Sequence, residues 1–93
     1  MLRTIRFHNE ARLEVLEIAR YAGQPLLDVI DEAITNISLM PDVWPMWRGR
    51  RELRLRVLPK WRYSIVYTVD AESVFIVALA HHKRRPGYWL SRL

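Results

Sequence analysis

The sequence has no cysteine, and it has no long apolar run among its 93 residues. Without cysteine, a disulfide framework and thiolate catalysis are excluded, and zinc could be held only by three histidines with carboxylates. The longest mostly apolar run, residues 74–80, falls far short of the roughly 20 residues that cross a bilayer. The first residues alternate like a strand rather than forming a signal peptide. We therefore expect a cytoplasmic protein with no metal or other cofactor.

Glycine and proline are also scarce, with three and five residues respectively, which excludes a fibrous or linker protein. Hydrophobic residues make up 51% of the chain and aromatic residues 11%, a content too apolar for a disordered protein. A chain of this length is too short for two cores, since a typical domain has about 100 to 150 residues. The sequence therefore predicts one folded domain over residues 1–93.

Charge is distributed unevenly along the chain. Residues 1–42 hold four arginines and seven acidic residues, whereas residues 43–93 hold eleven lysines and arginines and three acidic residues. The two parts carry net charges of −3 and +8, which together give the formal +5 of the whole chain. The second part predicts a cationic surface that attracts nucleic acid, an acidic protein segment or another anionic partner.

A short strand at residues 2–7 is followed by two amphipathic helices joined by a very short turn. We expect Asn9 to cap the first helix and Gly23 to end it. Pro25 suits the start of the second helix, and Pro41 ends it. The apolar stripes of the two helices repeat every three to four residues, which predicts an antiparallel helical hairpin. The stripes are Ala11, Val15, Ile18, Ala19 and Ala22, and then Leu26, Leu27, Ile30, Ala33, Ile34 and Ile37.

Three strands follow a loop at residues 41–51. Residues 52–58 alternate, which places Leu53, Leu55 and Val57 inward and Arg54 and Arg56 on an opposite, exposed face. Residues 63–69 form the hairpin partner, and residues 74–80 are apolar on both faces, as in a central strand covered on both sides. The predicted fold class is α+β, in which an N-terminal strand and an antiparallel helical hairpin pack on a small antiparallel sheet (β-α-α-β-β-β).

The segment after the last strand contains the residues most suited to chemistry. His81 and His82 can titrate near neutral pH, basic residues can hold phosphate, and Tyr88 and Trp89 can stack on a base. These are the parts of a ribonuclease or of an RNA-binding edge. In the alternative interpretation, the two histidines end the strand on opposite faces and Trp89 folds back as a hydrophobic lid. Adjacent histidines that point in opposite directions do not form a metal site.

Two further groups of residues each allow two interpretations. Arg54 and Arg56, joined by Arg62 or Lys60, suit a phosphate or carboxylate site, or they form a solvated outer face that protects an exposed strand. The loop residues Trp44 and Trp47 suit an anchor for a protein partner, or they cover the end of the core.

Four stretches of the chain resemble the RelE/ParE superfamily of bacterial toxins. They are residues 7–11 with Tyr21, Pro41 after the second helix, residues 51–67, and residues 78–89. The last stretch is the most specific, since an apolar strand runs into His and then into Arg-x-Pro-Gly-Tyr-Trp. The resemblance covers nearly the whole chain. It implies the toxin of a type II toxin-antitoxin module, of the plasmid-stabilisation type, in a hetero-oligomer with an antitoxin whose acidic or amphipathic C-terminal segment wraps the toxin.

The superfamily has two branches, which cleave mRNA on the ribosome (RelE-like) or poison DNA gyrase (ParE-like). RelE-like ribonucleases carry an arginine in the middle strand that stabilises the transition state, and Ser64 stands at that place here. Loss of such a donor typically costs about 3 to 4 kcal/mol. The resemblance therefore favours a ParE-like gyrase inhibitor, which is not an enzyme.

The alternatives are an mRNA endonuclease and a non-toxic relative that only binds an antitoxin. The endonuclease would use Arg54, Arg56, His82, Arg84 and Tyr88. The residues expected to bind the antitoxin or the target are Arg54, Arg56, Arg62, His82, Lys83, Arg84, Arg85, Tyr88 and Trp89.

Overall fold

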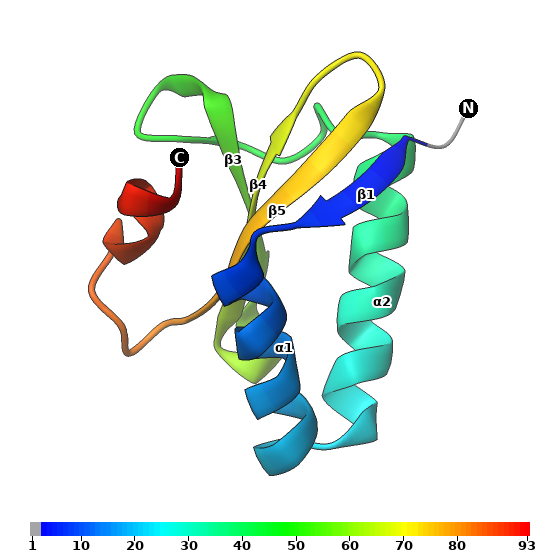
Figure 1. Cartoon of the computed structure of the whole chain (residues 1–93), viewed down its shortest axis with the longest axis vertical. Coiled ribbons are helices and arrows are strands. Elements are labelled where there is room, and N and C mark those ends of the chain that lie inside the picture. Colours follow the sequence, from blue (N-terminus) through cyan, green and yellow to red (C-terminus); the bar gives the residue numbers. More distant parts are fainter. Residues whose placement is uncertain (1–2) are drawn as a thin grey trace.

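The computed structural model describes residues 3–93, apart from the side chain of Arg51, and confirms the α+β fold class. Two helices pack on one face of a five-stranded sheet (Figure 1). The elements in chain order are β1 (Thr4–Phe7), α1 (Asn9–Tyr21), α2 (Gln24–Leu39), β2 (Met46–Trp47), β3 (Arg50–Leu58), the 3₁₀ turn η1 (Pro59–Trp61), β4 (Tyr63–Val69), β5 (Ser73–His81) and the 3₁₀ turn η2 (Tyr88–Arg92). No helix within residues 3–93 is long and apolar enough to span a membrane.

The sheet is mixed rather than wholly antiparallel. Its strand order is β1-β5-β4-β3-β2, with β1 parallel to β5 and the other neighbours antiparallel. A parallel pair is possible here because the helical hairpin and the three following strands lie between β1 and β5 in the chain, which is ample for a crossover. The predicted loop at residues 41–51 contains the two-residue strand β2 and the start of β3. Leu2, which the predicted first strand included, lies outside the described residues.

The ends of the helices are close to the predicted positions, with one correction. The N-cap of α1 is His8 rather than Asn9, and its Nδ1 accepts the Glu10 N–H at 3.0 Å. Gly23 has φ of +80° and separates the two helices, which suits a residue without Cβ. The predicted stripe of α2 is buried except for Leu27, which is half-buried, but Ala19 and Ala22 of α1 are exposed.

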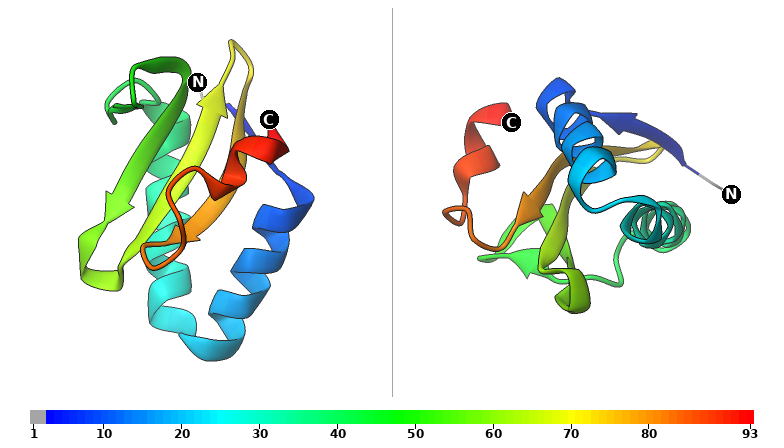
Figure 2. Two further views of the ribbon diagram at one scale, coloured as in Figure 1. Left: turned by 90° about the vertical axis from the view of Figure 1, so that its left-hand side faces the viewer. Right: turned by 90° about the horizontal axis from the view of Figure 1, so that it is seen from below.

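The sheet has a core on each face, and the two faces of β3 differ from those predicted from the sequence. The helix-facing core includes Ile65, Tyr67 and Ile76, and the Tyr67 hydroxyl donates to the Pro41 carbonyl at 2.5 Å. The opposite face buries Leu53, which packs in the cluster of Trp89 under the C-terminal segment. Figure 2 shows this segment on the side of the sheet away from α2. The alternation of β3 was correctly predicted, but Arg54 and Arg56 are not on an open face. Arg56 contacts α2, and Arg54 contacts the loop that follows α2.

Val77 is an extra residue in β5 that allows this strand to serve both cores. Val66 pairs with Ala78 while Tyr67 pairs with Ile76, so Val77 has no partner in β4. Val77 and Ala78 are consecutive yet both lie in the core away from the helices, which is the expected effect of a β-bulge. The bulge also lies where β1 has ended, since β1 pairs only with residues 73–76 of β5.

Candidate functional site

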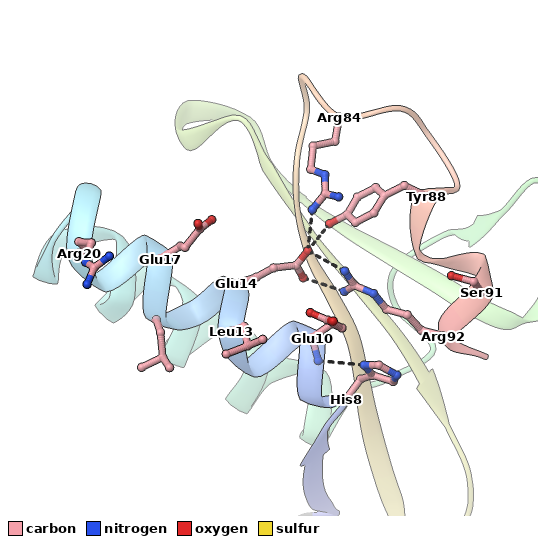
Figure 3. A pocket seen from close by; sticks show the side chains of 11 residues that line it. His8, Glu10, Leu13, Glu14, Glu17, Arg20, Arg84, Tyr88, Ser91 and Arg92 are labelled. Carbon is pink, nitrogen blue, oxygen red and sulfur yellow. Dashed lines mark hydrogen bonds and ion pairs between the residues drawn. The ribbon is translucent and has the colours of Figure 1, made fainter.

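Glu14 of α1 receives hydrogen bonds from four residues of the C-terminal part of the chain. Figure 3 shows those from Arg84, Tyr88 and Arg92. Its Oε1 accepts from the Leu79 N–H at 3.0 Å and from Arg92 Nη1 at 2.9 Å. Its Oε2 accepts from the Tyr88 hydroxyl at 2.6 Å, from Arg92 Nη2 at 3.0 Å and from Arg84 Nη1 at 3.2 Å. We call Glu14, Arg84, Tyr88 and Arg92 the carboxylate hub.

The hub satisfies the backbone of β5 where β1 no longer does so. Just beyond the pairing with β1, the Val77 carbonyl accepts from Arg92 Nη1 at 3.0 Å, and the Leu79 N–H donates to Glu14. Backbone groups at such an edge need partners when they are removed from water. The Glu14–Arg92 pair therefore takes the place of a further stretch of strand and attaches η2 to the sheet.

The electrostatics of the hub indicate a structural role. The side chains of Glu14 and Arg92 are 13% and 11% exposed, so the pair is largely removed from solvent. Burial, together with the hydrogen bond to Glu14, raises the pKa of Tyr88 well above its ordinary value. The hydrogen bond to Glu14 also raises the pKa of Arg92. Tyr88 is thus held as a protonated donor, and its ring lies 3.6 Å from the guanidinium carbon of Arg84.

A cleft of about 980 Å³ lies between the hub and the outer face of α1. Leu13 and Leu16 line it and are more than half exposed. Glu17 and Arg20 line it from the next turn of the helix (Figure 3). Exposed apolar side chains bordered by charged ones are typical of a surface that binds a protein.

His81 and His82 point to different sides of the sheet, as one of the two interpretations predicted. His81 packs edge-on against Tyr63, with ring centroids 4.9 Å apart. His82 Nε2 lies 2.9 Å from the hydroxyl oxygen of the buried Ser64, in a pocket of about 240 Å³ on the face of the sheet away from the helices. Within residues 3–93, no cluster of three or more histidine and acidic side chains is arranged to hold a metal ion.

The two loop tryptophans and Trp89 have packing roles. Trp47 meets Trp89 edge-on at a centroid distance of 5.5 Å, and Trp89 is buried as the predicted lid. The indole N–H of Trp89 is buried without a hydrogen-bond partner in the described part of the chain. Trp44 packs against the helix-side core and stacks on the guanidinium group of Arg56.

Arg54 and Arg56 are already bound to the backbone of their own chain. Arg54 Nη1 donates to the carbonyl of Trp44 at 2.6 Å, and its other amino group lies 3.8 Å from the Asp42 carboxylate. Arg56 donates to the carbonyl of Ala33 at 3.4 Å. The prediction that these arginines lie on a solvated outer face is therefore wrong.

Four exposed basic residues gather at the end of the sheet formed by η1 and the start of the loop after β5. They are Lys60, Arg62, Lys83 and Arg85, which we call the basic end. The segments are adjacent because Tyr63 pairs with His81 and because the His82 N–H donates to the Arg62 carbonyl at 2.9 Å. None of the four forms an ion pair with any described residue.

The predicted site residues therefore occupy four places rather than one surface. Arg54 and Arg56 lie on the helix side of the sheet, and Arg84 and Tyr88 belong to the hub. Trp89 is in the outer core with His82 at its margin, and the remaining predicted residues form the basic end with Lys60. Sequence reasoning placed Glu14 on the wet side of its helix. Its spacing from Ala11 and Ile18, three and four residues away, could have identified a carboxylate on the buried face. No local pattern marks Arg92.

Comparison with known proteins identifies the family of this fold. The family described as the ParE toxin of the type II toxin-antitoxin system, parDE, matches residues 5–86, from β1 to the loop before η2. A comparison with curated proteins gave no match. The matched region covers most of the chain and includes both helices and every strand of the sheet except the first residue of β1. The chain therefore belongs to the ParE toxin family of type II toxin-antitoxin systems.

Proposed function

We propose that this toxin inhibits DNA gyrase in the cytoplasm without catalysing a reaction, and that its antitoxin relieves the inhibition. The observation that carries the proposal is the dispersal of the residues on which an endonuclease would depend. Arg54 and Arg56 lie on the helix side of the sheet, His82 lies on the other side, and Arg84 and Tyr88 are bound to Glu14.

The state of the individual groups supports this choice. A general acid or base must come within about 3 Å of the proton that it transfers, with a pKa near the working pH. The Tyr88 hydroxyl is instead committed to a carboxylate, and its pKa is raised further from neutrality. Ser64 supplies no positive charge where the ribonuclease branch has its arginine, and its hydroxyl group is hydrogen-bonded to His82.

The antitoxin site that we propose is the cleft along α1. An amphipathic segment could bury its apolar side chains on Leu13 and Leu16, and its acidic side chains could approach Arg20 and Arg84 at the rim. Of the residues predicted to bind a partner, Arg62, His82, Lys83, Arg84 and Arg85 are exposed, and we keep these as candidates for contacts with the antitoxin or the target.

A supercoiling assay with purified gyrase tests the proposed activity. We expect the toxin to inhibit supercoiling and to stabilise cleaved DNA complexes, and we expect the cognate antitoxin to reverse both effects. His82→Ala should not abolish the inhibition, since His82 has no catalytic role in this proposal and is one of several candidate contacts. Unchanged supercoiling at saturating toxin would contradict it, particularly if message were cleaved in a translating extract and His82→Ala abolished that cleavage.

A further inference from the structure

We propose that the basic end binds the phosphate backbone of a nucleic acid. The four cations come from two segments, residues 60–62 and 83–85, which the sheet brings together at one end. Adjacent pairing of β4 and β5 holds these segments in place, together with the hydrogen bond from the His82 N–H to the Arg62 carbonyl. This proposal does not depend on gyrase, because it concerns binding to nucleic acid alone.

The charges at the basic end are not neutralised by the protein itself. Lys60, Arg62, Lys83 and Arg85 are all exposed, and no described acidic residue lies within ion-pair distance of any of them. Lys60 makes one other contact, with its Nζ 5.7 Å from the centre of the Trp61 ring, and this leaves its charge in place. When clustered cations bind a nucleic acid, they release the counterions that are condensed on its phosphates, and this favours a polyanionic ligand.

The composition of this surface favours nucleic acid over protein. The centres of protein interfaces are poor in lysine and rich in apolar and aromatic side chains, whereas nucleic-acid interfaces are polar and strongly positive. The large exposed apolar residues lie chiefly elsewhere, at Leu13, Leu16 and Tyr21 of α1 and between Leu39 and Met46. Among the large apolar residues that the structure describes, only Val57, opposite Ser64 in the sheet, is exposed close to the basic end.

Two further polar side chains adjoin the basic end, and one of them, Arg84, also donates a hydrogen bond to Glu14 of the hub. The exposed His82 and the guanidinium group of Arg84, which is 53% exposed, line the small pocket that contains Ser64. Imidazole and guanidinium groups at the rim of a cationic surface can hydrogen-bond phosphate oxygens. The basic end and these neighbouring groups therefore offer several side chains that can contact phosphate oxygens.

Fluorescence polarisation with a labelled DNA duplex and a labelled single-stranded RNA tests the proposal. The test variant combines Lys60→Gln, Arg62→Asn, Lys83→Gln and Arg85→Gln, with asparagine at position 62 because the φ there is +58°. The control combines Arg6→Gln, Arg12→Gln, Arg20→Gln and Arg48→Asn, with asparagine at position 48 because the φ there is +48°. Both proteins then change from a net charge of +5 to +1. Comparison of the two separates a local site from overall charge.

We expect the basic-end variant to bind at least about tenfold more weakly, and the control to stay within about threefold of the wild type. The slope of log K against log salt should fall in magnitude by about 3 to 4 for duplex DNA in the basic-end variant only. Whichever of the two ligands, duplex DNA or single-stranded RNA, binds more tightly identifies the kind of nucleic acid that this surface prefers. If the four-residue variant does not fold, Lys83→Gln/Arg85→Gln should still lower the slope by about half as much.

Equal loss in both variants would overturn the proposal, because net charge alone would then explain the binding. No loss in the basic-end variant would overturn it as well. A polyglutamate peptide that bound more tightly than either nucleic acid, with the same loss in the basic-end variant, would assign the surface to an acidic protein instead. The gyrase assay plays no part in these measurements, so the two proposals can fail separately.

Discussion

The carboxylate hub and the basic end contain the same kinds of cationic side chain in opposite circumstances. At the hub, Arg84 and Arg92 share the carboxylate of Glu14, and Arg92 is largely buried. At the basic end, four cations face solvent without an acidic partner among the described residues. We therefore expect a basic residue that is paired with an acidic side chain to stabilise the fold. A basic residue without such a partner remains available to a ligand.

The origin of the difference lies in the charge asymmetry of the chain. Glu14 belongs to the net negative part, residues 1–42, and the arginines that it binds belong to the net positive part. The packing of α1 on β5 brings one carboxylate from the first part against the C-terminal segment of the second. Only the cations within reach of this carboxylate are neutralised by it.

Glu14→Gln should have the largest effect on stability. An amide in place of the carboxylate leaves Arg92 as a largely buried charge without its counterion, and breaking a buried pair in this way costs about 3 to 5 kcal/mol. Urea unfolding measures the loss, and a red shift of the tryptophan emission would report exposure of Trp89 as η2 detaches.

Glu17→Gln is the matched control for Glu14→Gln, because Glu17 lies one turn further along α1 and is exposed. It should change the unfolding free energy by less than about 0.5 kcal/mol. Equal and small effects of the two substitutions would show that the Glu14 pair behaves as an ordinary surface ion pair, and the contrast between the hub and the basic end would lose its basis.

Tyr88→Phe should have an intermediate effect. At neutral pH the variant loses one hydrogen bond to a charged group, which costs about 1.5 to 3 kcal/mol. The folded protein raises the pKa of Tyr88, so the contribution of this hydroxyl is present below its ordinary pKa of 10.0 and is lost as the pH rises through the raised value. The difference in stability between wild type and variant should therefore shrink above about pH 10.

Thermal unfolding from pH 7 to 11 tests the Tyr88 prediction, with Tyr21→Phe as a control because Tyr21 is 78% exposed. Alkaline unfolding should persist in Tyr88→Phe, since burial raises the pKa of Tyr67 to about 12 and also raises that of Tyr63. A gap between wild type and Tyr88→Phe that stayed constant up to pH 11 would contradict the role of the protonated hydroxyl.

Neutralising the basic end should have the smallest effect on folding. The variant with substitutions at all four positions should unfold within about 0.5 kcal/mol of the wild type, because no described acid loses a partner. Urea denaturation of this variant beside Glu14→Gln makes the comparison directly. A loss of more than about 1 kcal/mol would mean that these cations stabilise the fold.

The sequence predicted the elements well because each depends on neighbouring residues. The stripe from Leu26 to Ile37 predicted α2, and the alternation before Pro59 predicted β3. The faces of β3 were assigned wrongly because alternation separates two sets of side chains without saying which set meets the helices. Here both faces are covered, so Leu53 and Arg56 are each partly or wholly buried on opposite sides.

The environment of the candidate site residues was harder to predict, because a local pattern does not show which residues meet in the folded chain. The terminal motif directed attention to His82, Arg84, Tyr88 and Trp89, but it could not show that Tyr88 is hydrogen-bonded to a glutamate 74 residues earlier. It also could not separate Arg84, which is paired with Glu14, from Arg85, which forms no ion pair with a described residue.

Short-range patterns alone specify the order of the helices and strands, the apolar stripes and the excess of positive charge after residue 42. Periodicity and capping act over a few residues and can be recognised without coordinates. Folding decided which charges are neutralised, since Glu14 and Arg92 meet across 78 positions of the chain. A carboxylate acts on the cations that packing brings within hydrogen-bonding distance, and that distance is a property of the tertiary structure.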